Sequence, residues 1–261
     1  MAQEELEQEE ILDGEALRMG FFDHLDELRQ RLTKAVLALV VGTVIGFGLA
    51  GPALEILQEP YCVIRSAGDC ELLIIDPTGT IMVYFRVALM IGGILSIPMV
   101  TYQLLMFILP GLTKREKRYV LFSIPATTFL FLIGTLFSWY VLMPPALGFL
   151  EGFQPTIFKP EWTADLYLSF VTSLVFWMGV AFQTPLIFFI VSLLGFFEAG
   201  TLVSQWRIAV VGASIAAAMI TPTIDPVNMF LVMAPLLTLY ALSIVLVYIG
   251  RKISGVDKEP A

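Results

Sequence analysis

Long apolar stretches dominate this sequence, and several are close to the length that crosses a membrane. A transmembrane helix needs about 20 consecutive apolar residues. Only 15% of the 261 residues are charged and 57% are hydrophobic, whereas a soluble domain typically carries about 25% charged residues. We therefore expect an all-α integral membrane protein and exclude a soluble enzyme. The expected membrane domain covers residues 19–251, with six spans at residues 35–51, 81–109, 120–143, 166–194, 208–221 and 229–249.

The fifth and sixth spans are expected to be short and to form a helical hairpin. Only 14 residues separate Arg207 from Pro222. At about 1.5 Å of rise per residue, such a helix is shorter than a hydrocarbon core of about 30 Å. Beside a short helix the bilayer thins or the helix sits shallow. We therefore expect a locally weakened membrane barrier at this hairpin.

The basic residues predict the orientation, because cytoplasmic loops carry an excess of Lys and Arg. Of the 15 basic residues, only Arg65, Arg86 and Lys159 fall on one side of the six expected spans. The other side is therefore expected to be cytoplasmic and to hold both termini. The N-terminal segment 1–18 is acidic and is predicted to be a disordered tail. Residues 252–261 are predicted to form a cytoplasmic C-terminal tail.

The segment before the first span predicts an amphipathic helix. Leu25, Leu28 and Leu32 recur at helical spacing on one face, while Glu27 and Arg31 lie four residues apart on another. Such a helix commonly anchors a protein at the membrane interface, with its acids and bases paired locally. This local pairing is the alternative to any role of Glu27 in binding.

A second polar stretch lies between the second and third spans. Residues 110–118 contain four basic residues and one acidic residue, Glu116. Taken alone, this is an ordinary positively charged cytoplasmic loop. The two polar stretches together match a known pattern, which begins at His24-Leu-Asp-Glu27-Leu28-Arg29-x-Arg31-Leu32. Its later parts are Pro60, Pro98-x-x-x-Tyr102-Gln103, Phe107-x-x-Pro110-x-Leu112-x-x-x-Glu116-x-Arg118, Tyr167-x-Ser169-Phe170, Phe182-Gln183-x-Pro185, and Thr221-Pro222 before Asp225.

This pattern resembles the signature of TatC, the multispanning subunit of the twin-arginine protein translocase, over residues 20–250. The resemblance implies a receptor, not an enzyme, that binds signal peptides with consecutive arginines at the cytoplasmic face of the inner membrane. It implies partners of the TatA and TatB type, transport driven by the proton-motive force, and no cofactor. Self-association is left open, and no nucleic-acid ligand is expected. The recognition residues implied are Glu27, Leu28, Arg29, Leu112 and Glu116, and further functional positions are His24, Pro60, Phe107, Gln183 and Asp225.

The chemistry of arginine supports the same site. A guanidinium group presents a planar fork of donors that suits a carboxylate. The side chains of two consecutive arginines diverge, so two acceptors on different elements are needed. Glu27 and Glu116 can supply them, although both can also be ordinary partners in structural salt bridges.

One position departs from the family. TatC proteins commonly have a glutamate where this sequence has Gln183, and a carboxyl group at membrane depth usually marks function. Gln183 keeps hydrogen bonding but cannot titrate. Its polar amide needs a partner, either on another helix of this chain or on a TatA- or TatB-type helix.

Two other classes of function were weighed. A secondary transporter for a small solute would line a polar path with Arg86, Gln103, Thr172 and Gln183, but the chain shows no inverted repeat. A serine protease at Ser214 lacks an activating histidine or aspartate in a span. One histidine and two cysteines do not supply a zinc-type ligand set. Cys62 and Cys70 fall in one outward loop, where we expect a disulfide bond.

Overall fold

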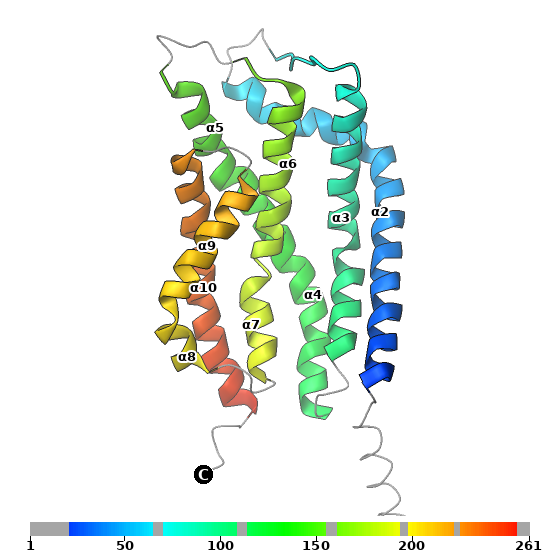
Figure 1. The fold of residues 1–261 in the computed structure, drawn as a ribbon, viewed down its shortest axis with the longest axis vertical. Helices are drawn as coiled ribbons and strands as arrows, with labels where there is room; N and C mark the ends of the chain where they lie inside the picture. Colours follow the sequence, from blue (N-terminus) through cyan, green and yellow to red (C-terminus); the bar gives the residue numbers. More distant parts are fainter. Residues whose placement is uncertain are drawn as a thin grey trace, which may run out of the picture.

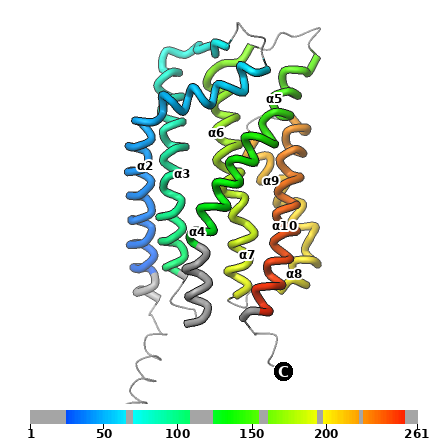
Figure 2. The backbone as a smooth tube through the Cα atoms, turned by 180° about the vertical axis from the view of Figure 1, so that it is seen from behind, coloured from blue at the N-terminus to red at the C-terminus, as the bar shows by residue number. Residues whose placement is uncertain are grey.

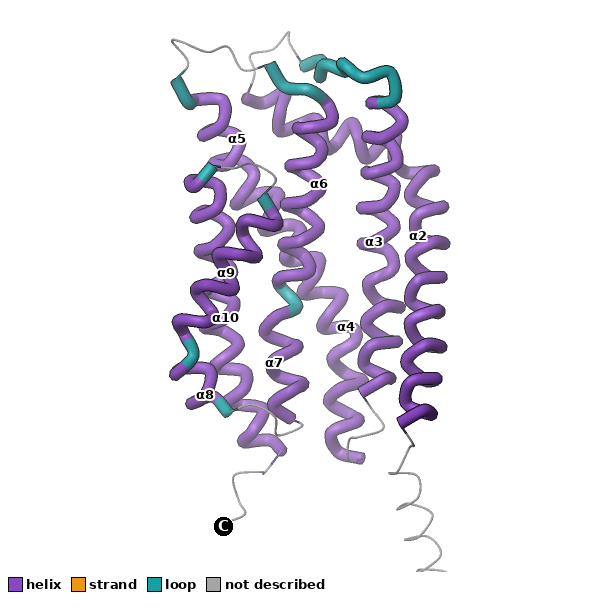
Figure 3. The backbone as a smooth tube through the Cα atoms, in the orientation of Figure 1, coloured by secondary structure: helices purple, strands orange, loops and turns teal. Residues whose placement is uncertain are grey.

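The computed structural model describes residues 21–64, 70–108, 114–154, 161–193, 198–221 and 225–254. This part of the chain is helical (Figure 3), and its β-type pairing is limited to an isolated bridge between Leu73 and Thr163. The expected tail at residues 1–18 lies outside it. In chain order the elements are α2 (Phe21–Ile64), α3 (Gly79–Ile108), α4 (Lys114–Phe137), the π-helical turn η2 (Ser138–Leu142), α5 (Met143–Gly152), α6 (Ala164–Ala181), α7 (Thr184–Leu193), α8 (Ala199–Ser204), α9 (Trp206–Ile220) and α10 (Pro226–Ser254).

Five helical stretches in the described part of the chain are long and apolar enough to cross a membrane. This confirms the expected all-α membrane class. The apolar helix α9 is shorter, with 15 residues. The five long stretches are Leu25–Ile64, Gly79–Phe107, Ile124–Gly152, Ala164–Leu193 and Pro226–Lys252.

The long helices lie side by side, with α2 and α3 at one edge of the molecule and α9 and α10 at the other (Figures 1 and 2). Helix α6 lies between the two edges, and its Val171, Leu174 and Met178 are fully buried. We call the end at which α2 and α4 begin the basal end (Figure 1). We call the opposite end the cap, formed by residues 52–64, 70–78, 143–152 and 161–163.

Helices α2 and α3 pack through small residues. A Cβ atom added to Gly42 would lie 2.7 Å from the carbonyl oxygen of Gly92. One added to Gly46 would overlap the carbonyl oxygen of Ala88. Because small residues let two backbones approach, they are common where membrane helices meet. Both glycines therefore hold α2 against α3 over more than one helical turn.

Helix α2 continues beyond the expected end of the first span. It contains Pro52 and Pro60, and its last part runs across the cap (Figure 1). Prolines inside helices cause such kinks. In the cap, the rings of Tyr61 and Tyr167 lie 5.4 Å apart, and each also packs against Trp162. Aromatic contacts thus join the last part of α2 to the start of α6.

Two expectations about the lengths of the helices are wrong. The third span was expected to end at residue 143, before Pro144 and Pro145, but these prolines occupy the first turn of α5, which follows directly after η2. The sixth helix was expected to be short, but α10 has 29 residues and contains Pro235. A proline has no backbone N–H to donate to the preceding turn, and the π-helical hydrogen bonding of η2, in which the N–H of Met143 donates to the carbonyl of Ser138, adjusts the helix there. Within membrane helices, neighbouring groups re-satisfy the carbonyl that a proline frees.

The expected disulfide bond is also absent. Cys62 and Cys70 are both free thiols and are partly exposed. The side-chain amide of Gln58 in α2 donates a hydrogen bond to the backbone carbonyl of Cys70. Cys70 is therefore held against α2 through this hydrogen bond.

Candidate functional site

Glu27 lies in the second turn of α2, where its carboxylate is only partly satisfied. The Nε atom of Arg31 donates a hydrogen bond of 2.8 Å to Oε1 of Glu27, and Nη2 of Arg31 contacts the same oxygen. The Glu27 side chain is 16% exposed and that of Arg31 is 20% exposed. The other oxygen, Oε2, is buried and accepts no hydrogen bond from any described residue. Since a buried acceptor without a donor is unfavourable, this oxygen can take a further donor.

The residues that follow Glu27 are exposed on the surface of α2. Leu28 and Arg29 are both exposed, as is Leu25 one turn earlier. The start of α2 therefore presents an apolar strip and a basic side chain beside the Glu27–Arg31 pair. His24 lies in α2, but its side chain is outside the described part of the structure.

The second predicted element is the start of α4. Glu116 lies in the first turn of α4, and its side chain is outside the described part, as is Leu112 altogether. Phe107, near the end of α3, is half-buried. The starts of α2 and α4 and the end of α3 all lie at the basal end (Figure 1). The fold thus brings the helices that carry Glu27 and Glu116 to the same end of the molecule.

Gln183 lies at the junction of α6 and α7, and the structure identifies its partner. Its Nε2 atom donates a hydrogen bond of 3.0 Å to the backbone carbonyl of Thr127 in α4. The residue is 8% exposed, and its Oε1 atom is buried without a donor among the described residues. The amide therefore links the break between α6 and α7 to α4 within this chain, and it leaves one acceptor open.

Asp225 and Pro60 have clear local roles. Asp225 precedes α10, and its Oδ1 accepts a hydrogen bond of 2.7 Å from the backbone N–H of Asn228. This is the geometry of an N-cap, which stabilises the first turn of a helix. Pro60 lies in the last part of α2 and lines a pocket in the cap together with Trp139 of η2. Neither residue lies at the basal end with Glu27.

The residues proposed for a solute pathway do not form one. The Nη1 atom of Arg86 donates a hydrogen bond of 2.9 Å to Oδ1 of Asp165, which ties α3 to the start of α6. Thr172 donates to the backbone of its own helix, and Ser214 does the same. No group of metal-ligating side chains occurs among the residues that the structure describes.

Sequence reasoning missed contacts between distant residues. It placed Arg86 at the end of a span without its partner Asp165, which lies 79 positions later. It also missed the ion pair of 2.9 Å between Arg251 of α10 and Glu198. A single sequence carries no periodic signal for such pairs. By contrast, the spacing of four between Glu27 and Arg31 was a signal, and the structure contains that pair.

These features define a multispanning helical membrane protein with an acidic site among basic residues at one end and an aromatic cap at the other. The chain matches the family described as Sec-independent protein translocase protein (TatC) over residues 23–235. It belongs to the TatC family, which confirms the resemblance seen in the motifs. Its general role is therefore in twin-arginine protein translocation, and a solute transporter is not favoured.

Similar proteins cover most of the chain. It is 34% identical to the TatC protein of Aquifex aeolicus, over 92% of this chain and 98% of that protein. It is 36% identical to the chloroplastic TATC protein of Pisum sativum, over 85% of this chain and 62% of that one. A crystal structure of the twin-arginine translocase receptor TatC has the same fold, with a TM-score of 0.79 and 33% identity over 87% of this chain and 99% of that chain.

Proposed function

We propose that this protein is the core receptor subunit of a twin-arginine translocation system in the cytoplasmic membrane. Its five long helices and α9 would cross the membrane six times, which puts both termini on the same side. The distribution of basic residues favours the cytoplasm for that side. The basal end, where α2 and α4 begin, is then cytoplasmic.

The open carboxylate oxygen of Glu27 carries the proposal. Arg31 occupies Oε1 from within the same helix, whereas Oε2 is buried without a described donor. A guanidinium from the signal peptide would satisfy Oε2 with a charge-assisted hydrogen bond. Glu116, at the start of α4, would accept from the second arginine. The two acids come from different helices, as two diverging arginine side chains require.

The neighbouring side chains would complete the recognition of the peptide. Signal peptides carry an apolar stretch after their basic region, and the exposed Leu28 offers an apolar contact beside Glu27. Leu112 would add a second apolar contact from the loop before α4. Arg29 would repel cationic peptides that lack the correct geometry.

Recruitment of TatA- and TatB-type partners completes the proposed role. In TatC proteins the position of Gln183 commonly carries a glutamate. Here the amide is bound to α4 through Thr127. Transport driven by the proton-motive force would then proceed without a titrating group at this position. His24 and Phe107 would support the fold near the peptide site, whereas Pro60 and Asp225 would support the fold away from it.

Peptide affinity tests the proposal directly. Losing a hydrogen bond to a charged group costs about 1.5–3 kcal/mol, so Glu27→Gln and Glu116→Gln should each weaken binding of a twin-arginine signal peptide by about tenfold to a hundredfold. A twin-lysine peptide should be little affected. Asp26→Asn is the matched control, because Asp26 is an exposed acid adjacent to Glu27 in the same helix.

The double variant, Glu27→Gln with Glu116→Gln, gives the decisive measurement. If both acids hold one bound motif, the two losses should be less than additive. Binding should be measured on the purified protein in nanodiscs, with thermal unfolding as a check that all variants fold. Unchanged affinity in the double variant would contradict the proposal and leave Glu27 as a partner of Arg31 alone.

A further inference from the structure

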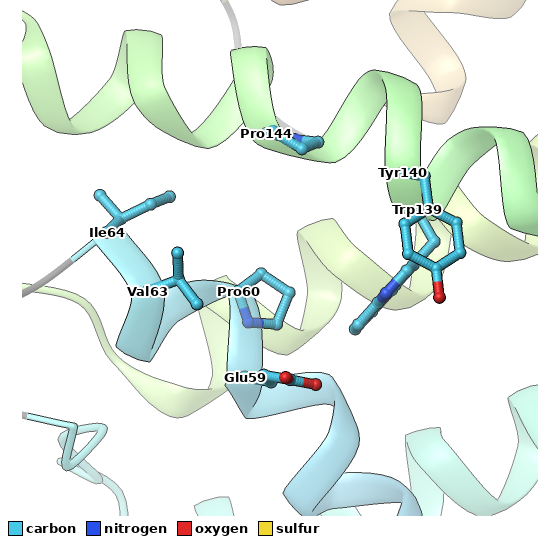
Figure 4. A pocket seen from close by; sticks show the side chains of 7 residues that line it. All are labelled: Glu59, Pro60, Val63, Ile64, Trp139, Tyr140 and Pro144. Atoms are coloured by element: carbon cyan, nitrogen blue, oxygen red, sulfur yellow. The ribbon is translucent and has the colours of Figure 1, made fainter.

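A small pocket lies in the cap, between the last part of α2 and the π-helical turn η2 (Figure 4). Its volume is about 300 Å³, at the lower end of the range for small-molecule sites. The pocket lies far along the chain from Glu27 and plays no part in the proposed peptide site. Its lining residues are Glu59, Pro60, Val63, Ile64, Trp139, Tyr140 and Pro144.

One charged group faces this pocket. Glu59 is exposed, and none of the described residues forms an ion pair with it. In Figure 4 its carboxylate points toward the Trp139 ring, which comes from the other wall. The remaining lining is apolar apart from the ring N–H of Trp139 and the hydroxyl of Tyr140. Among the residues that the structure describes, the lining of the pocket therefore combines one negative charge with two aromatic residues and includes no basic side chain.

The π-helical turn places the aromatic residues. Helix α4 passes directly into η2 at Ser138, and α5 continues after Leu142. A π turn holds one residue more than an α turn, which changes the direction of the side chains within it, and such turns are frequent at functional sites. Trp139 and Tyr140 are consecutive residues of this turn, and both line the pocket.

This lining fits a primary ammonium group. The faces of aromatic rings attract cations, and a carboxylate accepts charge-assisted hydrogen bonds from N–H donors. A quaternary ammonium would use the rings but offers no donor to Glu59. An anionic group would be repelled by Glu59. A protonated primary amine matches both the rings and the carboxylate.

The surroundings of the pocket indicate that the amine belongs to a lipid. Val63 is 78% exposed and Tyr140 is 69% exposed. Trp139 and Tyr140 belong to an apolar stretch, Ile124–Gly152, that is long enough to cross a membrane. The other wall of the pocket lies at the end of a second such stretch, Leu25–Ile64, because Val63 and Ile64 are its last residues. Amphipathic aromatic side chains are enriched at the level of lipid headgroups. We propose that the pocket binds the ammonium headgroup of phosphatidylethanolamine through Glu59, Trp139 and Tyr140.

Lipid retention measured by native mass spectrometry tests this site. The detergent-solubilised protein is mixed with phosphatidylethanolamine, phosphatidylcholine or phosphatidylglycerol of matched acyl chains. Wild type should retain phosphatidylethanolamine best. Because exposed charge pairs and cation–π contacts are individually weak, Glu59→Gln should lower its retention by about threefold to tenfold. Glu55→Gln is the matched control, because Glu55 is exposed one turn earlier in α2 and does not line the pocket.

Three outcomes are decisive. If the Trp139 ring contributes, Trp139→Leu should also reduce the preference for phosphatidylethanolamine over phosphatidylcholine. The unfolding temperature of this variant shows whether the variant folds. Equal retention of the three lipids by wild type would overturn the proposal. Unchanged lipid retention in Glu59→Gln, with loss of a co-purifying membrane partner, would also overturn it and assign the pocket to an amine on a protein.

Discussion

The helix pairs at the two edges of the molecule are built in opposite ways. At one edge, the long helices α2 and α3 approach through Gly42, Gly46 and Gly92 until their backbones touch. At the other edge, α9 has 15 residues, and one of its faces, with Ile208, Val211 and Ile215, is exposed. The first pair is held rigidly by backbone contact. The second pair leaves an apolar surface open to lipid or to another helix.

The side of α9 that faces α7 and α10 is also open. A groove of about 350 Å³ lies between α7, α9 and α10 and is lined by small residues of α9, including Ala209, Gly212 and Ala213. Small residues thus serve two purposes in one molecule. In α2 and α3 they bring backbones together, whereas in α9 they leave space. The rigid edge includes α2, whose start carries Glu27.

The largest expected effect is a loss of folding when the rigid edge is forced apart. In Gly46→Leu the new side chain would overlap the backbone of Ala88, which cannot move aside as a flexible side chain can. Overpacking of this kind costs about 1–3 kcal/mol or more. We expect little folded protein after purification, with a clear drop in unfolding temperature for what remains. Gly48→Leu should behave like wild type, because no atom lies within 4 Å of a Cβ at Gly48.

The sequence was sufficient for the helical class and for local pairs. Apolar length predicts membrane helices because an exposed backbone cannot be left unsatisfied in lipid. The i, i+4 spacing of Glu27 and Arg31 predicts their contact because one helical turn separates them. Both features are encoded within a few residues. The motifs at the start of α2 were identified by their resemblance to the TatC family.

Other features depend on contacts that no short window contains. The first and third spans were expected to end at residues 51 and 143, but the helices continue past these positions through Pro52 and Pro144. The pairing of Arg86 with Asp165 joins helices that are distant in the chain. The partner of Gln183 on α4 was one of two alternatives, and only the arrangement of α4 beside α6 decides between them.

An intermediate effect is expected in hydrogen exchange. At about 1.5 Å per residue, α9 is about 22 Å long, less than a hydrocarbon core of about 30 Å. Water should therefore reach the loop end of α9 and the start of α10. In nanodiscs, backbone amides at residues 217–220 and 229–232 should exchange at least about tenfold faster than those in the middle of α3. Equal protection in both regions would mean that the bilayer is not thinned beside the hairpin.

The smallest expected effect distinguishes the two uses of glycine. In Gly212→Ala the added methyl group meets no atom within 4 Å, and alanine favours a helix over glycine by about 0.5–1 kcal/mol. This variant should unfold at the wild-type temperature or slightly above it. Gly42→Ala makes the same chemical change at the rigid edge, where the Cβ would lie 2.7 Å from the carbonyl oxygen of Gly92, and should unfold at a lower temperature. Since helix propensity favours both changes equally, the difference between the two variants measures packing alone. Equal destabilisation would mean that the hairpin is packed as tightly as α2 and α3.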